Sequence, residues 1–196
     1  TLHNLLDYDV AKFSSAEVQL RNILPEWKNK SSSLKLKDVL MRYLDFIERH
    51  IEKMEKFMDG EGLSAVFVNN GVMKAFIEEM EERLSICADA DVKDACLLAC
   101  VQGINHYKIS MYGTAAAFAN ALGMEKQAML FYEAEVSEKQ IDDRLSQLAE
   151  HEINMNAKTP IVSAIGHEND RPVLDDVAAF VRGDGEAENA VQGVLQ

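Results

Sequence analysis

The sequence predicts an all-α protein, built as a four-helix bundle with a crossover helix between the second and third long helices. Only three prolines occur in 196 residues, and hydrophobic residues make up 47% of the chain. The stretch 91–122 contains no proline and is apolar on nearly every side, which is typical of the buried member of a bundle. We expect it to be capped at Asp89 and to end near Gly123.

The first predicted helix covers about residues 14–28. Ser14 or Ser15 would be its N-cap, and Pro25 should kink it or end it nearby. Glu17 falls in phase with the apolar residues of this helix, where an ordinary surface glutamate would not lie. Glu17 is therefore a candidate for an inward-facing carboxylate.

The second predicted helix covers about residues 34–58 and ends near Gly60. At about 100° per residue, His50 lies within its apolar face, close to Tyr43. Glu48 lies at the edge of that face. The helix therefore presents a histidine to the interior of the predicted bundle.

The rest of the predicted bundle is a crossover and a last long helix. A connection over 63–70 leads into an acidic amphipathic helix over 72–88. The last long helix covers about 125–152, and its apolar stripe contains Glu138, with Asp142 one turn further on. Two helical hairpins joined by a long connection give the ferritin-like topology.

The chain divides into a predicted bundle over 1–157 and a C-terminal extension over 158–196. The extension is polar and interrupted by proline and glycine, so we expect no core of its own. Its one amphipathic segment, 173–181, could form a short helix.

Composition excludes several classes of function. The net charge of −13 disfavours binding to nucleic acid or to an anionic membrane surface, because both need basic patches. No apolar run approaches the length of a membrane span, and the first residues do not resemble a signal peptide. Three cysteines are an odd number without disulfide-like spacing, which favours a reducing cytoplasm.

Polar residues in phase with the apolar stripes come from all four long helices. Carboxylates and imidazoles from facing helices are how bundles hold di-iron or di-manganese centres. The candidate metal ligands are Glu17, His50, Glu138 and Asp142. Residues that could form an outer shell, or a degenerate site, are Gln102, Asn105, His106 and Glu48. No catalytic residue is assigned.

The chain resembles the YciF-type bacterial stress-protein family of the ferritin-like superfamily, over about residues 5–150. The matching pieces are Ala16 to Leu20, Ile23 to Pro25, Gln102 to Tyr107, Tyr112 to Thr114, and Glu138-Lys139 with Asp142. The resemblance implies a helical bundle, a homodimer, a stress-related setting and a di-metal centre. It does not establish a biochemical activity.

The chain departs from the family pattern at the polar positions. The family typically has Glu at Asn105 and at Lys108, and in the second helix a carboxylate has become Phe46 and a glutamine His50. An amide in place of a carboxylate lowers the negative charge of the site by one. We expect Lys108 to face solvent; if it reached inward, its ammonium could replace a metal by pairing with Glu138 or Glu17.

Two hypotheses follow. The first is a cytoplasmic protein with a complete or reduced iron or manganese centre that handles iron, oxygen or peroxide, with Glu17 and Glu138 as the best ligands. The second is a metal-free helical module, in which the same positions form a buried hydrogen-bond network and function lies in self-association or partner binding. The metal hypothesis is slightly favoured by Glu17, His50, Glu138 and Asp142.

Cys96 and Cys100 are four residues apart and share a helical face, as two thiolate ligands could. Without a second pair of cysteines or a matched histidine, we expect them to pack as small apolar residues.

Overall fold

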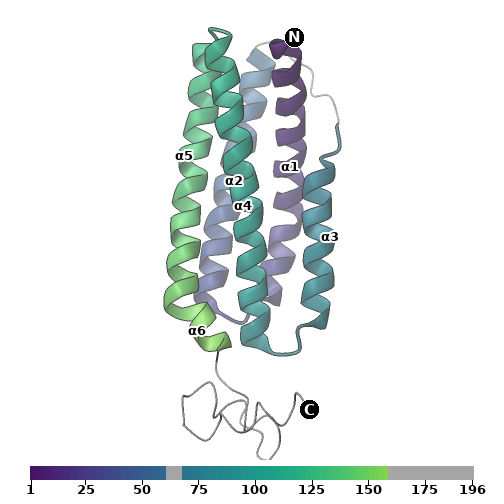
Figure 1. Ribbon diagram of the computed structural model, residues 1–196, viewed down its shortest axis with the longest axis vertical. Coiled ribbons are helices and arrows are strands. Elements are labelled where there is room, and N and C mark those ends of the chain that lie inside the picture. The colour runs from purple at the N-terminus through teal and green to yellow at the C-terminus, as the bar shows by residue number, and fades with distance from the viewer. Residues whose placement is uncertain (61–67, 159–196) are drawn as a thin grey trace, which may run out of the picture. The chain divides into compact units, whose positions relative to one another are not determined.

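The computed structural model describes residues 1–60 and 68–158, and this part of the chain is helical apart from short turns (Figure 1). The elements are α1 (Leu2–Lys30), α2 (Leu34–Gly60), α3 (Gly71–Ile86), α4 (Ala90–Ala121), α5 (Glu125–Leu148), the π-helical turn η1 (Ala149–Ile153) and α6 (Asn154–Ala157). The predicted all-α class is confirmed.

Four long helices form the bundle. Helix α1 packs against α2, α4 packs against α5, and the contacts of α1 with α4 and of α2 with α5 close the ring. Helices α1 and α5 run in one direction and α2 and α4 in the other (Figure 1). Helix α3 packs on α1 and α4 from outside. It is the predicted crossover helix, because it returns the chain to the end at which α4 begins.

Helix α1 is longer than the sequence predicted at both ends. It begins at Leu2, with Thr1 as N-cap, and not near Ser14. Leu6 lies about two helical turns before Phe13 on the same apolar stripe, and it is buried. Burial of such a stripe stabilises a helix even where capping residues and helix propensity do not predict one. The hydroxyl of Ser14 donates to the Val10 carbonyl one turn back, at 3.1 Å, as it does within helices and not at caps.

Pro25 lies inside α1 and does not end it. A proline costs one backbone hydrogen bond and clashes with the preceding turn. Leu24 and Trp27 on either side are fully buried, and the Trp27 indole donates to Glu81 on α3 at 2.7 Å. This packing carries the helix past Pro25 to Lys30.

The remaining boundaries differ little from the prediction, except at the C-terminal end. Asp89 caps α4 through the backbone N–H groups of its first turn, and Gly123 follows with a φ of 71°. The last helix is not one α-helix over 125–152, because it gives way to η1 after Leu148. The predicted extension over 158–196, with its segment 173–181, lies beyond the described residues except for Lys158.

A buried carboxylate fixes the end of the bundle at which α1 turns into α2. Asp94 of α4 is 1% exposed and accepts from the backbone N–H groups of Ser32 at 3.0 Å and Ser33 at 2.8 Å. Those donors belong to the turn before α2. The first turn of α2 is capped by Ser33, whose hydroxyl oxygen accepts from the Leu36 N–H at 3.2 Å, so Asp94 ties α4 to the turn that carries this cap. No local pattern predicts this contact, because its two sides lie about 60 residues apart.

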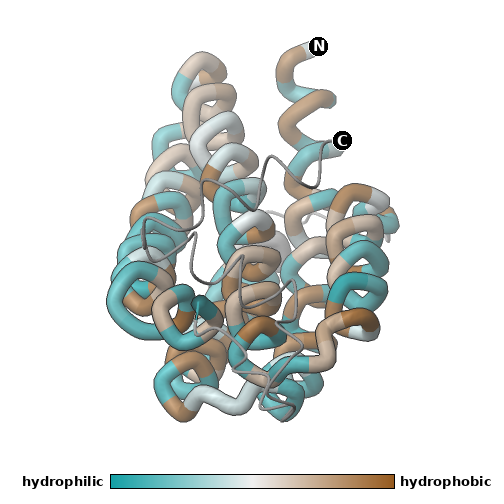
Figure 2. Tube along the Cα trace, turned by 60° about the horizontal axis from the view of Figure 1, so that its bottom comes forward, coloured by the Kyte–Doolittle hydropathy of each residue, from teal (hydrophilic) through white to brown (hydrophobic). Residues whose placement is uncertain are grey.

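The core is apolar along most of the bundle. Its largest buried side chains include Trp27, Leu20, Leu40, Ile47 and Phe131. Hydrophobic and hydrophilic segments alternate along each helix (Figure 2), as expected for helices with one inward face. Within residues 1–60 and 68–158, no helix combines the length and apolar character that a membrane crossing requires.

Candidate functional site

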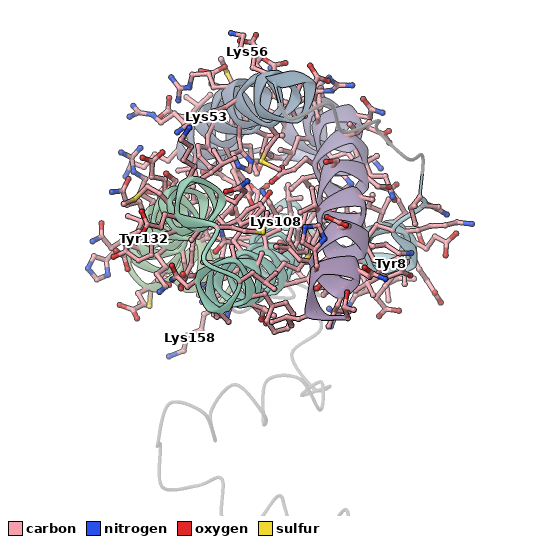
Figure 3. The ribbon with its side chains drawn as sticks, turned by 90° about the horizontal axis from the view of Figure 1, so that it is seen from above. Tyr8, Lys53, Lys56, Lys108, Tyr132 and Lys158 are labelled. Carbon is pink, nitrogen blue, oxygen red and sulfur yellow. The ribbon has the colours of Figure 1, made fainter. Side chains whose placement is uncertain are left out.

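The centre of the bundle contains a lysine. Lys108 of α4 is fully buried and lies among the four long helices when the bundle is viewed along its axis (Figure 3). The prediction that Lys108 faces solvent is wrong. It lies three residues after Asn105 and four before Tyr112, both fully buried, and residues at these spacings share one helical face.

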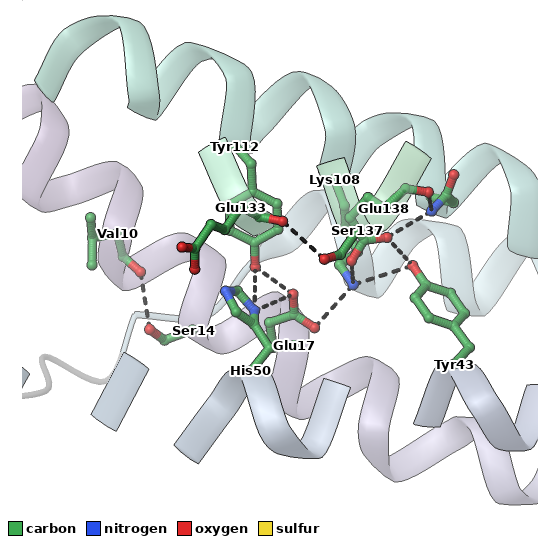
Figure 4. A network of polar contacts seen from close by, with 11 residues as sticks. Val10, Ser14, Glu17, Tyr43, His50, Lys108, Tyr112, Glu133, Ser137 and Glu138 are labelled. Carbon is green, nitrogen blue, oxygen red and sulfur yellow. Dashed lines mark hydrogen bonds and ion pairs between the residues drawn. The ribbon is translucent and has the colours of Figure 1, made fainter. Parts of the chain in front are cut away.

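Carboxylates from opposite sides of the bundle surround the Lys108 ammonium (Figure 4). Its Nζ lies 3.1 Å from Glu17 Oε2 of α1 and forms an ion pair with Glu138 Oε1 of α5. It also donates to the Tyr43 hydroxyl of α2 at 3.2 Å. The same nitrogen lies 4.7 Å from the centre of the Tyr43 ring and 5.8 Å from that of Phe46. Each of the four long helices therefore contributes to one cluster.

Glu138 is held by neutral donors as well as by the ammonium. Its Oε2 accepts from the Tyr43 hydroxyl at 2.7 Å and from Asn105 Nδ2 at 2.7 Å. The same amide donates to the Glu138 backbone carbonyl at 3.0 Å. Asn105 therefore ties α4 to α5 through hydrogen bonds alone, without bringing a charge.

Glu17 is held by an aromatic hydroxyl and a histidine. Its Oε1 accepts from the Tyr112 hydroxyl and lies 3.4 Å from His50 Nδ1. Phe46 stacks on the His50 ring with an interplanar angle of 5°. Among the described residues, His50 Nε2 and Asn105 Oδ1 have no hydrogen-bond partner.

Burial and charge separate the pKa values of the two carboxyl groups. Burial raises the pKa of Glu17, but the Lys108 ammonium and the contacts with His50 and Tyr112 outweigh it and lower that pKa to about 2. Burial raises the pKa of Glu138, and the charge of Glu17 adds to this against the opposing effect of Lys108. Lys108 therefore has two carboxyl partners, Glu17 with a lowered pKa and Glu138 with a raised pKa.

Lys108, Tyr43 and Tyr112 stay protonated at neutral pH. Burial lowers the pKa of Lys108, but Glu138 and Glu17 more than offset this, so the pKa lies above its usual value. Burial, with the nearby carboxylates, raises the pKa of Tyr43 and of Tyr112 well above 10. The centre thus contains one cation, two hydroxyl donors and two carboxyl groups, one with a lowered pKa and one with a raised pKa.

Asp142 belongs to a different cluster, nearer the surface of α4 and α5. It accepts from Gln102 Nε2 at 2.9 Å and lies 2.9 Å from His106 Nε2. Gln102 also donates to Ser146 Oγ at 2.8 Å. The His106 side chain is 60% exposed, and Glu48 of α2 is exposed too. The structure therefore brings together Glu17, His50, Asn105 and Glu138, and places Gln102, His106, Asp142 and Glu48 elsewhere.

The central cluster does not fit a di-metal centre as its residues are arranged. Such a centre takes about four carboxylates and two histidines, whereas Glu17, Glu138 and His50 converge here around an ammonium. No group of three or more His, Cys, Asp or Glu side chains in the described residues is arranged to hold a metal ion. Bound iron or manganese stays a prediction.

Sequence reasoning missed Tyr112 as a member of the cluster. It expected Lys108 in solvent, and its stated alternative, an inward Lys108 paired with Glu138 or Glu17, is the arrangement found. Lys108 and Tyr112 lie three and seven residues after Asn105. These spacings put all three on one helical face, so an inward Asn105 predicts an inward Lys108 and Tyr112. A lysine was assigned to solvent because buried lysines are rare unless paired. Its two partners come from helices far away in the sequence.

The fold and its centre define an all-α bundle protein with an ion-paired polar interior. Residues 1–158 match the family described as "Domain of unknown function (DUF892)", and the chain belongs to this family. It is 30% identical over 159 residues to protein YciF of Escherichia coli strain K12, covering 81% of this chain and 96% of that protein. The resemblance to YciF-type proteins is confirmed.

Solved structures show the same architecture. The crystal structure of the E. coli stress protein YciF matches with a TM-score of 0.73 and 30% identity, covering 81% of this chain and 99% of that one. The YcfI protein of Rhodopseudomonas palustris matches with a TM-score of 0.72 and 27% identity, covering 74% of this chain and 93% of that one.

Proposed function

We propose that this chain is a metal-independent, stress-related bundle protein that acts by self-association or by binding partner proteins. The observation that carries the proposal is the Lys108 ammonium between Glu17 and Glu138. The similarity to a protein described as a stress protein supports the setting. The carboxylates of a ferritin-like interior need a cation, and here that cation is the ammonium of Lys108.

The fixed ammonium opposes a metal ion in two ways. It occupies one oxygen of each carboxyl group, so a metal would have to displace it. A displaced Lys108 would leave its charge buried beside a divalent cation, because its raised pKa favours the protonated form. An unpaired buried charge costs several kcal/mol. The amide of Asn105 adds no charge that could compensate for this repulsion.

A competing proposal retains an iron or manganese centre that handles iron, oxygen or peroxide. It is favoured by the convergence of Glu17, His50 and Glu138, and by the unpartnered Nε2 of His50 within the described residues. It requires Lys108 to leave the centre. The two proposals therefore make opposite statements about one measurable quantity, the metal content of the purified protein.

Elemental analysis of protein purified without chelator or metal-affinity tag tests the proposal. We expect no stoichiometric iron or manganese, even after anaerobic incubation with ferrous ion. Retention of about one or two metal atoms per chain would contradict it. If that metal disappears in Glu138→Gln and persists in Glu133→Gln, the competing proposal holds. Glu133 is the matched control, because it lies on the same helix with a half-exposed side chain paired to Lys53.

Self-association is the more specific part of the proposal. Large apolar side chains are exposed on the outer faces of α1 and α5, among them Leu5, Tyr8, Met129 and Tyr132, and exposed apolar area favours association. We expect a homodimer in sedimentation velocity experiments. A monomer at every concentration tested would leave binding to other proteins as the mode of action.

A further inference from the structure

A groove between α2 and α5 gathers arginines on a strongly acidic protein. Arg42 and Arg49 of α2 and Arg144 of α5 line a cavity of about 420 Å³ in this groove. They are three of the seven arginines in the chain. Among the described residues, Asp45 is the one carboxylate in the same lining. Three guanidinium groups and one carboxylate give the cavity a local charge of about +2, whereas the whole chain carries −13.

Two of these arginines are not neutralised by a carboxylate within the described part of the chain. Arg42 pairs with Asp38 one turn before it, at 2.9 Å. Arg49 and Arg144 are exposed and form no ion pair with any carboxylate of the described residues. A guanidinium group presents five N–H donors in a planar fork that fits phosphate and carboxylate oxygens. The cavity therefore presents two arginines whose donors can bind an anion.

A second, smaller cavity adjoins the arginine-lined one. Its volume is about 160 Å³, and the two cavities share the lining residues Phe46, Arg49 and Ser137. The lining of the smaller cavity also includes Ala134 of α5 and His50 of α2. The two cavities therefore form one groove along the contact between α2 and α5, which leads from the exposed arginines to a buried histidine.

His50 gives the second indication of a ligand. It is 6% exposed, and its Nδ1 lies 3.3 Å from the Tyr112 hydroxyl and 3.4 Å from Glu17 Oε1. Its Nε2 points away from these two groups (Figure 4) and has no hydrogen-bond partner among the described residues. A buried polar atom without a partner is costly. A hydroxyl group can donate to an imidazole nitrogen or accept from it, so it would satisfy Nε2 in either tautomer.

We propose that this groove binds a phosphate monoester of a small hydroxylated molecule. The phosphate group contacts Arg42, Arg49 and Arg144, and a hydroxyl of the organic part contacts His50 Nε2. A phosphate monoester carries a charge of about −1.5 to −2 at pH 7, which matches the local charge, whereas a carboxylate brings only one negative charge. The volume of the larger cavity lies in the usual range of small-molecule sites. A nucleic acid does not fit, because the rest of the chain is acidic.

Isothermal titration calorimetry of the full chain with glycerol phosphate tests the proposal. Propyl phosphate, which lacks the hydroxyl groups, and inorganic phosphate are the comparison ligands. We expect saturable binding of about one glycerol phosphate per chain at millimolar concentrations, and binding of the other two about tenfold weaker. Absence of saturable binding would overturn the proposal, and so would equal affinity for propyl phosphate. The site uses no carboxylate of the central cluster, so the result is independent of the metal content of the protein.

Arginine variants locate the site. Arg49→Gln and Arg144→Gln each remove one charge from an exposed side chain, so both should fold, as circular dichroism can verify. Each should weaken the binding of glycerol phosphate about tenfold. Arg83→Gln is the matched control, because it removes the same charge from an exposed arginine of α3 that is paired with Glu79, and it should bind as the wild type does. Equal weakening in all three variants would reflect the net charge of the protein and overturn the proposal.

The contact with His50 has a readout of its own. The nitrogen chemical shift of His50 Nε2, measured by NMR, should move when glycerol phosphate saturates the wild type, because the nitrogen gains a hydrogen bond. In Arg144→Gln the same change should need a glycerol phosphate concentration about tenfold higher. An unchanged Nε2 signal at saturation would overturn the placement of the hydroxyl group.

Discussion

Two polar clusters on α4 and α5 are built from the same kinds of residue, one turn apart, and differ in burial. The inner cluster joins Glu138 to an amide and a basic group of α4, Asn105 and Lys108. The outer cluster joins Asp142 to Gln102 and His106 of the same helix. The Lys108 and Glu138 side chains are 1% and 0% exposed, against 60% and 25% for His106 and Asp142.

The comparison shows that burial determines how much a charge pair matters. In the outer cluster, water can solvate either partner when the other is removed, so the pair contributes about 0–1 kcal/mol. In the inner cluster, removing one partner leaves an uncompensated buried charge, at a cost of about 3–5 kcal/mol. The inner cluster should therefore hold the fold in one arrangement, whereas the outer cluster should tolerate change.

The largest predicted effect is that of Lys108→Met. The substitution keeps the apolar stem of the side chain and removes the cation of Glu17 and Glu138. We expect the free energy of unfolding to fall by about 3–5 kcal/mol, measured by urea denaturation at neutral pH.

Lys139→Met is the matched control for Lys108→Met. Lys139 is 57% exposed and pairs with Glu135 of the same helix at 2.5 Å, and such pairs contribute about 0.3–0.5 kcal/mol. Equal losses in the two variants would mean that the lysine stem, and not the internal charge, accounts for the effect.

Glu17→Gln should have the next largest effect, and it should depend on pH. The pKa of Glu17 is about 2 in the folded protein, against 4.5 ordinarily. A lowered pKa stabilises the fold fully above pH 4.5, and this contribution is lost as pH falls from 4.5 towards 2. Its size is on the order of 3 kcal/mol. Urea denaturation should show that the wild type loses its advantage over Glu17→Gln across that range. A constant difference from pH 7 to pH 3 would contradict the ion pair.

Glu138→Gln should change stability less than Glu17→Gln, although both carboxyl groups contact Lys108. The pKa of Glu138 is raised, mainly by burial, so its contribution is present below pH 4.5 and is lost as pH rises through the folded-state pKa. The variant also leaves one carboxylate for one ammonium. We expect the free energy of unfolding of Glu138→Gln to differ from that of the wild type by no more than about 1 kcal/mol at neutral pH. The variant should become more stable relative to the wild type as pH rises. A loss equal to that of Lys108→Met would mean that the buried ammonium depends mainly on Glu138.

Periodicity predicted the architecture and part of the inner cluster. The spacing of Glu17, His50 and Glu138 from the apolar residues of their own helices was sufficient to predict that each side chain points inward, because the face on which a residue lies depends only on the local sequence. The same local reasoning gave α3 as the crossover helix. It could not give the start of α1 at Leu2, because the burial of Leu6 depends on packing from outside the helix.

The partners within the cluster could not be predicted in the same way. Whether Lys108 turns inward depends on two carboxylates 91 and 30 residues away in the sequence. Asp142 was grouped with Glu138 because they are one turn apart, but that step moves the side chain about 40° around the helix and towards its neighbour α4. The position of a residue on its helical face therefore identifies candidate inward side chains, and only the packing of the helices determines which of these side chains contact one another.

The smallest predicted effect is that of Asp142→Asn in the outer cluster. The amide keeps an oxygen that can accept from Gln102, and it loses only a charge beside His106, whose side chain is 60% exposed. We expect unfolding free energy to change by no more than about 0.5 kcal/mol at neutral pH, with metal content unchanged. The same protein preparations can be used for both measurements, with wild type and Glu138→Gln alongside. A loss of several kcal/mol would mean that water does not reach Asp142, and that the contrast between the two clusters is not one of burial.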